Sequence, residues 1–248
     1  MTREDNAAGF GGGVMVTAGG SCIMTNGTIS GNRANYGGGV FVRSARANIN
    51  DCTIAGNKAI TGGGISAHKS SQPATVIVSG GTIGGTGTDA NKATGTGSEG
   101  NGGGVYVDMN STFKMHGGTI KNNTSDAGKG VYVAASSGGT GNQDGYFIMG
   151  GKACVGDWGS DGTLKDGNDV YLARNNNSGS PARIKIDKGK PITESKVACI
   201  TPRDYVSGEI VVWMSDGSSV GAYTNKFTVT PKGGQTWSVD SDGKLKTP

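Results

Sequence analysis

The stretch GGGVYVDMNSTFKMHGGTIKNN, residues 102–123, combines runs of glycine with a hydrophobic residue at nearly every second position. Alternation of this kind predicts β-strands with one buried face, because successive side chains of a strand point to opposite sides. Glycine between the strand-like runs predicts sharp turns, since it adopts positive φ freely, and asparagine tolerates the same conformation. We therefore expect short strands whose valine and isoleucine side chains fill a core, joined at corners made by glycine and asparagine.

The same pattern recurs along the chain. Triple glycine followed by a β-branched residue stands at 11–14, 37–40, 62–65 and 102–105, with weaker copies at 128–131 and 167–172. The steps between the first copies are 26, 25, 40 and 26 residues, which indicates a unit of about 25 residues with one insertion. Each unit carries two further landmarks, a Thr-Ile pair and, in most units, an asparagine three residues later. The isoleucines are Ile29, Ile54, Ile83 and Ile120, and the asparagines are Asn32, Asn57 and Asn123.

A repeat of this length predicts stacked units, because a single unit cannot bury its own apolar face. We predict an all-β fold, a right-handed parallel β-helix with three short strands in each coil of about 25 residues, over residues 1–180. Longer strand-like runs from residue 181 predict an irregular β part at 181–248, either further coils or a β cap. Glycine accounts for 48 of 248 residues and only 33% are hydrophobic, yet the regular alternation argues against a disordered chain.

Units of this form resemble a known family. The pattern GGGVYV…FxMxGGTIxxN at 102–123, GNDVYLA at 167–173 and KFTVTPKGGQTWSVDSDGKLK at 226–246 are similar to the glycine-rich right-handed β-helix repeats of large bacterial surface proteins and adhesins. The resemblance implies the fold and an extracellular or cell-surface location. It implies no catalytic residue, because those repeats share no agreed catalytic motif.

Charge and cysteine content narrow the classes of partner. The net charge of +4 is modest and no basic run is interleaved with aromatic residues, so we expect no nucleic-acid partner. No stretch is long and apolar enough for a signal peptide or a membrane span, and the early first repeat suggests a fragment, expected to be monomeric. The four cysteines lack zinc-ligand spacing, so we predict no metal and no cofactor; free thiols and a disulfide both stay open.

An enzyme is the leading alternative, because β-helices often carry polysaccharide lyases and glycoside hydrolases. Their chemistry needs paired carboxylates or clustered calcium ligands with a base. Here Asp51, Asp108 and Asp126 fall at different positions of their units, and His68 and His116 do so too. We therefore predict no catalytic residue. A trimeric spike of the phage type is a third possibility, but the outward threonines of the Thr-Ile pairs do not suggest an apolar outer face.

One outward column carries the first group of candidate binding residues. Aligned triple glycines place the following residues at one position: Met15, Phe41, Ser66, Tyr106, Tyr132 and Tyr171. Aromatic side chains in a column suit sugar rings or partner side chains, which makes Phe41, Tyr106, Tyr132 and Tyr171 candidates. Two other interpretations stay open: a cross-strand stacking ladder that stabilises the sheet, and a column covered by inserted loops.

Two insertions carry the second group, since loops inserted in repeat proteins often bind ligands. The longer one, residues 84–101, is polar and contains Asp89, Asn91, Lys92 and Glu99, which we predict as binding residues. The other spans residues 134–146. Together these features predict a non-catalytic surface module, a stalk or an adhesin-like domain whose partner is a glycan or a surface protein.

Overall fold

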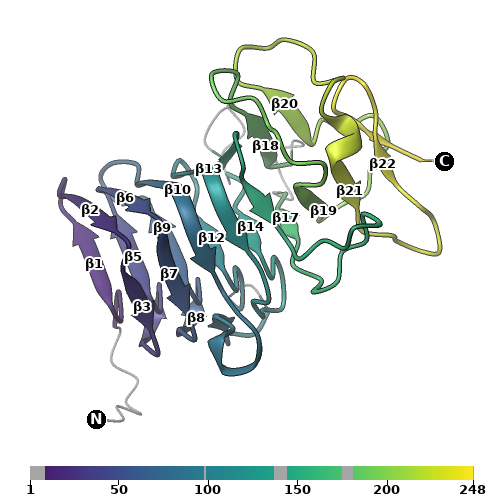
Figure 1. Ribbon diagram of the computed structural model, residues 1–248. Helices are drawn as coiled ribbons and strands as arrows, with labels where there is room; N and C mark the ends of the chain where they lie inside the picture. The colour runs from purple at the N-terminus through teal and green to yellow at the C-terminus, as the bar shows by residue number, and fades with distance from the viewer. Residues whose placement is uncertain (1–8, 98, 137–143, 175–180, 248) are drawn as a thin grey trace.

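The computed structural model describes residues 9–97, 99–136, 144–174 and 181–247. The predicted all-β class is confirmed: strands dominate, and the helices among the described residues are two short 3-10 turns, η1 (Gly87–Asp89) and η2 (Thr224–Lys226). Long parallel sheets run along the molecule from the N-terminal to the C-terminal part of the chain (Figure 1). This arrangement is compatible with a parallel β-helix.

The first sheet collects the strands that follow the triple glycines. Its eight strands lie in chain order: β1 (Val14–Thr17), β5 (Val40–Arg43), β9 (Ile65–His68), β12 (Val105–Val107), β14 (Val131–Val133), β17 (Val170–Leu172), β19 (Ala198–Pro202) and β21 (Phe227–Val229). All neighbours are parallel, and the residue after each triple glycine pairs with its counterpart in the next unit, as Val14 does with Val40.

The second sheet collects the strands around the Thr-Ile landmarks. Its main path is β2 (Ser21–Thr25), β6 (Arg46–Asn50), β10 (Thr75–Ile83), β13 (Thr112–Ile120), β15 (Tyr146–Met149), β18 (Arg183–Ile186) and β20 (Val212–Met214). Three shorter strands join it at the side: β3 (Thr28–Ser30), β7 (Cys52–Ala55) and β16 (Cys154–Val155). A third, small sheet holds β4 (Arg33–Tyr36), β8 (Lys58–Thr61) and β11 (Lys92–Ala93).

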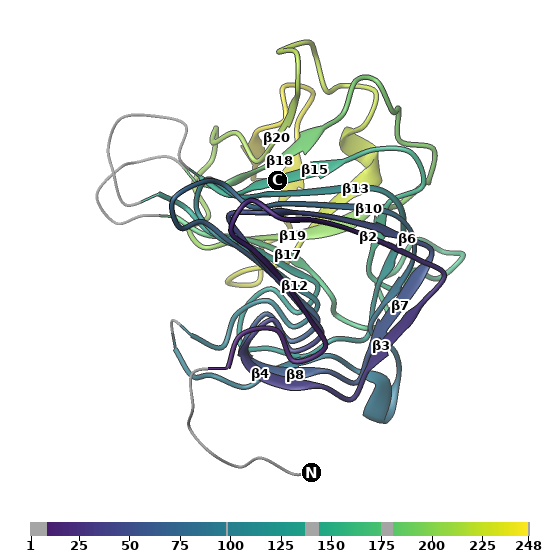
Figure 2. The same cartoon turned by 90° about the vertical axis from the view of Figure 1, so that its left-hand side faces the viewer.

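The chain passes through these sheets in turn, so the sheets surround one interior when viewed along the stack (Figure 2). Strands β18 and β20 extend the second sheet, and β19 and β21 extend the first. Neither sheet is interrupted at residue 181, where the sequence changes character. The antiparallel pair β22 (Ser238–Val239) and β23 (Leu245–Lys246) follows at the C-terminal end.

The core follows the alternation seen in the sequence. Val105 and Val107 are fully buried while Tyr106 between them is half-buried, and the pattern is the same in β14 and β17. Phe113 and Phe147 stack inside, with ring centroids 5.5 Å apart. One continuous hydrophobic cluster runs from Val16 to Leu245, which is how the units share a core that none could form alone.

The three glycines of each triplet have different roles. The first turns the corner, with a positive φ of 62° at Gly37 and 68° at Gly62. The second allows backbones to approach: a Cβ on Gly63 would lie 2.5 Å from the carbonyl carbon of Lys92. The third faces the interior, where a Cβ on Gly64 would lie 3.1 Å from Nδ2 of Asn91. The prediction that glycine turns the corner is confirmed for the first position only; the other two glycines are required by close packing.

The recurring asparagines form a buried hydrogen-bonded column, which we call the asparagine ladder. Its members are Asn32, Asn57, Asn91, Asn123 and Asn168, and all but Asn32 are buried. Each side-chain amide donates to the Oδ1 of the next at 3.0–3.1 Å, and that same Oδ1 accepts the backbone N–H of the preceding asparagine. The described asparagines with positive φ are Asn26, Asn110 and Asn122, so asparagine turns corners at those positions, as predicted. No ladder asparagine has positive φ, and the ladder asparagines instead hold neighbouring units together.

The segment 84–101 is more ordered than the predicted loop. It contains η1 and then β11, which pairs with β8 and brings Asn91 into the asparagine ladder. Part of the segment therefore belongs to the third sheet. Of the second insertion, 134–146, residues 137–143 lie outside the described part of the chain.

Candidate functional site

The outer face of the first sheet carries a continuous stack of rings, which we call the aromatic ladder. Its members are Phe10, Phe41, His68, Tyr106, Tyr132 and Tyr171, with centroid separations of 5.0–5.4 Å between neighbours. The three tyrosines are in direct register across β12, β14 and β17. Tyr106, Tyr132 and Tyr171, predicted from the alignment of glycine triplets, are thus brought together.

At its N-terminal end the ladder is covered. Phe41 is only 1% exposed, because the rings of Phe10, Tyr36 and His68 surround it. Phe41 therefore offers almost no surface to a ligand, and its role in binding stays a prediction. The column is covered in this half by the rings of Phe10 and Tyr36, not by the inserted loops weighed above. Phe10 and Tyr36 belong to neighbouring turns of the chain, so alignment of one column could not show that they close over it.

The one gap in the aromatic column is filled from a different position. Ser66 stands where the ladder needs a ring, and it is fully buried with no hydrogen-bond partner for its hydroxyl among the described residues. His68, two residues further along β9, stacks on Tyr106 at 5.2 Å instead. Its Nδ1 lies 3.4 Å from Oδ2 of Asp108, which fixes the ring.

Stacking decides which ring faces are available to a ligand. Tyr132 lies between Tyr106 and Tyr171 with interplanar angles of 11° and 8°, so both of its faces are covered. Tyr106 is covered on both sides too, by His68 and Tyr132. A sugar ring stacks on an open aromatic face, not on an edge. Within the described part of the ladder, Tyr171 is the tyrosine stacked on one side only, since the next unit has Thr201 in register.

A pocket of about 610 Å³ lies where the ladder ends, and we call it the Tyr171 pocket. Tyr171 contributes its ring, and Trp158 contributes a second aromatic side chain from the 156–166 loop. The Nε1 of Trp158 donates to the backbone oxygen of Val155 at 3.0 Å, which holds the indole in place. The main polar lining residues are Asp169, Thr201, Thr228 and Thr230, with Asp126 and Lys129 also present. Aromatic side chains beside threonine hydroxyls suit a hydroxyl-rich ligand.

Asp169 is the acidic group of this pocket. Its Oδ1 accepts the backbone N–H of Lys129 at 2.8 Å, and the Thr201 side chain is a second hydrogen-bond partner. Burial raises the pKa of Asp169 above its ordinary value, although these hydrogen bonds act in the opposite direction. The carboxylate can accept hydrogen bonds from a ligand, and burial makes it an easier group to protonate than a surface aspartate.

A shallower depression of about 330 Å³ lies beside the ladder, on the side of Arg203. Tyr106 and Tyr132 line it, with Asp108 and Arg174. The guanidinium of Arg174 is paired with Glu209 at 2.7 Å. Burial raises the pKa of Tyr132 to about 12, which keeps its hydroxyl a neutral donor. The ladder thus presents ring edges on this side and an open ring face at Tyr171.

The four candidates of segment 84–101 do not join this site. Asn91 is fully buried and hydrogen-bonded in the asparagine ladder, so its side chain has a structural role there. Asp89, Lys92 and Glu99 are exposed, and none of them lines the Tyr171 pocket. Lys92 lines a separate hollow of about 460 Å³ together with Arg33 and Lys58.

Sequence reasoning missed Trp158, Asp169 and the threonines of the Tyr171 pocket. Trp158 lies in a turn between repeats that contains none of the sequence landmarks, so aligning the landmarks could not place it. The threonines had a detectable signal, because Thr201 occupies the column of the tyrosines in the strand β19. Aligning the C-terminal strands with the repeats would have shown that the ladder ends there.

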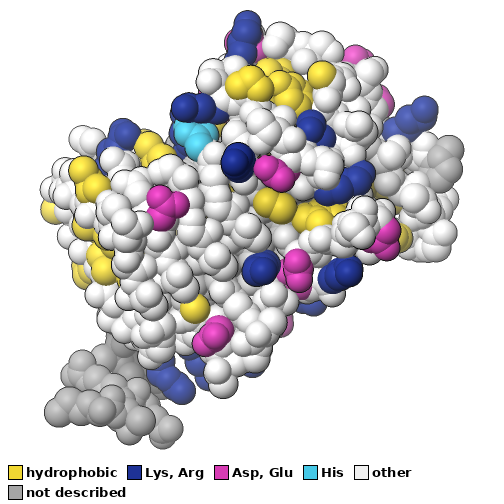
Figure 3. All heavy atoms as spheres, in the orientation of Figure 1, with side chains coloured by type: hydrophobic (Ala, Val, Ile, Leu, Met, Phe, Trp, Pro, Cys, Tyr) yellow, Lys and Arg dark blue, Asp and Glu magenta, His cyan; other side chains and the backbone are white. Residues whose placement is uncertain are grey.

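Side chains that could bind a metal ion or act as nucleophiles are dispersed over the described part of the molecule. In the described ranges, no three His, Cys, Asp or Glu residues gather as they would around a metal ion. Cys22, Cys52, Cys154 and Cys199 are all free, and burial raises the pKa of Cys154 to about 11, which makes it a poor nucleophile. Charged side chains of both signs are interspersed on the face shown in Figure 3. No helix in the described part of the chain is long and apolar enough to cross a membrane.

In comparisons with known proteins, no family model, no curated protein and no solved structure matches the chain.

Proposed function

We propose that this chain is a non-catalytic module that binds a saccharide in the Tyr171 pocket, built on a right-handed parallel β-helix. The single observation that carries the proposal is the end of the aromatic ladder, where a tyrosine stacked on one side only shares a pocket with Trp158, Asp169 and threonine hydroxyls. Saccharides offer C–H faces to aromatic rings and hydroxyls to polar groups, so both kinds of lining residue have a partner.

The β-helix accounts for the parallel register. One strand of each unit enters the first sheet and another the second, and every unit adds to the same interior. A right-handed path follows from the general preference of parallel crossovers. The resemblance of the repeats to those of bacterial surface proteins supports an extracellular or cell-surface location, with a glycan of a host or of the environment as partner.

A glycan array tests the proposal directly. We expect selective binding of one glycan class by the unmodified chain and at least tenfold weaker binding by Tyr171→Ala, because removing a stacking platform typically costs more than about 1.4 kcal/mol in a buried contact. Tyr132→Phe is the matched control, since it keeps the stack and changes only a hydroxyl outside the pocket. No binding to any glycan, or equal binding by Tyr171→Ala, would reject the saccharide site.

Product analysis on any bound glycan separates binding from catalysis. Asp169 is the group to replace, since its raised pKa is the property that a general acid needs. A non-catalytic module leaves the glycan intact in both the unmodified chain and the Asp169→Asn variant. Release of shortened sugars that stops in Asp169→Asn would replace the module with a carbohydrate-active enzyme.

A further inference from the structure

The outer face of the second sheet carries two neighbouring cations that form no ion pair with a carboxylate. Arg183 and Lys185 are alternate residues of β18, so their side chains leave the same face while Ile184 and Ile186 enter the core. Their Cα atoms are about 6.6 Å apart along the strand. Among the described residues, neither forms an ion pair.

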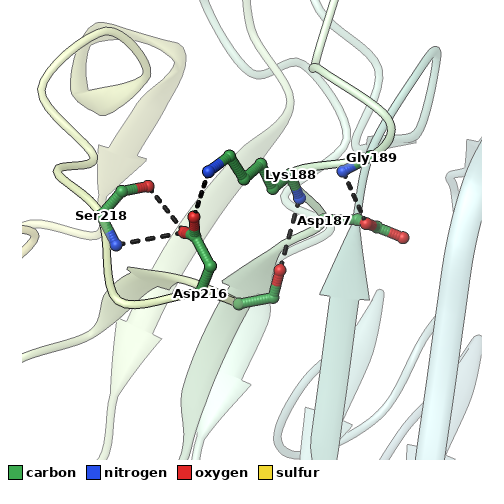
Figure 4. A network of polar contacts seen from close by, with 6 residues as sticks. Asp187, Lys188, Gly189, Asp216 and Ser218 are labelled. Carbon is green, nitrogen blue, oxygen red and sulfur yellow. Dashed lines mark hydrogen bonds and ion pairs between the residues drawn. The ribbon is translucent and has the colours of Figure 1, made fainter.

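Two lysines near β18 are paired with carboxylates. Lys114 Nζ lies 3.2 Å from Oδ2 of Asp187, which also contacts His116. Lys188 Nζ lies 2.5 Å from Oδ2 of Asp216, and the same aspartate accepts hydrogen bonds from Ser218 (Figure 4). Asp187 and Asp216 are thus already occupied, so the charge of Arg183 and Lys185 is available to a ligand.

Two aromatic rings flank Lys185. Its Nζ lies 3.5 Å from the centroid of the Tyr146 ring and 4.9 Å from that of Trp213. Tyr146, Lys185 and Trp213 come from the adjacent strands β15, β18 and β20, so the group extends about 10 Å across the sheet. All three side chains are half-exposed. The face therefore combines positive charge with apolar ring surface.

Two N–H groups on this face have no acceptor. The Nε of Arg183 and the Nε1 of Trp213 are buried and lack a hydrogen-bond partner within the described chain. Because protein atoms enclose both N–H groups, a ligand on this face contacts the exposed parts of the two side chains instead. Burial and the charge of Arg183 also lower the pKa of Lys185, although Asp144 acts in the opposite direction, and a bound anion would relieve the repulsion between the two cations.

We propose that the face formed by Tyr146, Arg183, Lys185 and Trp213 binds the acidic groups of an anionic polysaccharide. The two cations recognise carboxylate or sulfate oxygens, and the exposed parts of the rings contact the sugar carbons. None of these four residues lines the Tyr171 pocket, and they lie on a different sheet. The test of this site is therefore independent of the test of the saccharide site proposed above.

The test is calorimetric titration of the full chain with polygalacturonate, dextran sulfate and neutral dextran. We expect binding of at least one anionic polymer and none of dextran; polygalacturonate alone identifies carboxylate as the ligand group, and dextran sulfate alone identifies sulfate. Arg183→Gln and Lys185→Met should each weaken binding about tenfold, the effect of losing one charge-assisted hydrogen bond. Lys58→Gln removes the same charge from an exposed lysine of the third sheet and should change affinity less than about twofold.

Two further variants keep the test decisive if Arg183→Gln does not fold. Trp213→Ala removes the ring beside Lys185, and it should weaken binding about fivefold. Tyr171→Ala should leave binding of the anionic polymer unchanged. The proposal is overturned if neither anionic polymer binds, if dextran binds equally well, or if Lys58→Gln weakens binding as much as Lys185→Met, since net charge alone would then explain the result.

Discussion

The asparagine ladder and the aromatic ladder advance at the same step, one residue per unit, yet they differ in what surrounds them. Asparagine amides are buried and hydrogen-bonded along the column. Aromatic rings lie on the outer face, half-exposed from Tyr106 onward, and the column ends beside a pocket. Both columns hold neighbouring units together where they continue. The ligand site that we propose lies where the aromatic column stops, because its last member keeps an unused face.

The largest loss of stability is expected for a substitution in the asparagine ladder. Asn91→Ala removes the acceptor for the N–H groups of Asn57 and the donor to Asn123 and Ile54, all in a buried environment. We expect a loss of about 3 kcal/mol in the free energy of unfolding, since several buried groups lose partners at once. Urea denaturation followed by circular dichroism measures it.

The control for this variant is Asn48→Ala. Asn48 is half-buried on the outer face of β6, and its side chain accepts one long hydrogen bond from Arg46. Its replacement should change stability by less than about 0.5 kcal/mol. Equal effects of Asn91→Ala and Asn48→Ala would show that the buried ladder is no more important than a surface asparagine.

A smaller effect is expected in the aromatic ladder, and it should depend on position. Tyr132→Ala removes two stacking contacts and Tyr171→Ala removes one, so we expect losses of about 2 and about 1 kcal/mol. Ligand binding should follow the opposite order, with Tyr171→Ala the more harmful. Urea denaturation and the glycan titration, run on both variants, compare the two orders; the same ranking in both assays contradicts the view that function lies at the end of the ladder.

The smallest effect is a loss of stability at alkaline pH. Burial raises the pKa of Tyr132 from 10.0 to about 12, so the unfolded chain releases this phenolic proton first. The contribution of Tyr132 to stability is therefore complete below pH 10 and is lost as the pH rises through 12. Urea denaturation from about pH 9 to about pH 12 should show a smaller decline for Tyr132→Phe. Tyr106 and Tyr171, whose pKa values burial also raises, account for a remaining decline. Identical declines in both proteins would contradict the assignment.

Much of the fold follows from local patterns in the sequence. The Val-Tyr-Val strands place valine inside and tyrosine outside because the strand period is two, and the glycine triplets align them across units. Segment 84–101 was harder to predict, since Asn91 comes eight residues after Ile83 instead of three. A better landmark was present: Asn-Arg-Ala at 32–34 and Asn-Lys-Ala at 57–59 and 91–93 mark the third sheet in three units.

The candidate site was predictable only in part. The spacing of the glycine triplets identified Tyr106, Tyr132 and Tyr171, since the members of one column occupy the same position in their units. Exposure was not predictable, because Phe41 is covered by side chains from neighbouring turns and His68 comes from a different column. Trp158 lies in a connecting loop, so only the folded chain shows that it lines the same pocket as Tyr171.

The glycine triplets fix the contact between units without fixing the length of chain between them. Gly63 donates to the backbone oxygen of Gly102 at 3.0 Å across a 40-residue unit, and Gly38 makes the equivalent contact with Gly62 at 3.1 Å across a 25-residue one. The repeat architecture therefore keeps a constant spacing between units whatever the length of the segments that connect them. Segments of different length can be carried at one corner while the walls keep their register, so new surface chemistry can be added unit by unit without redesigning the core.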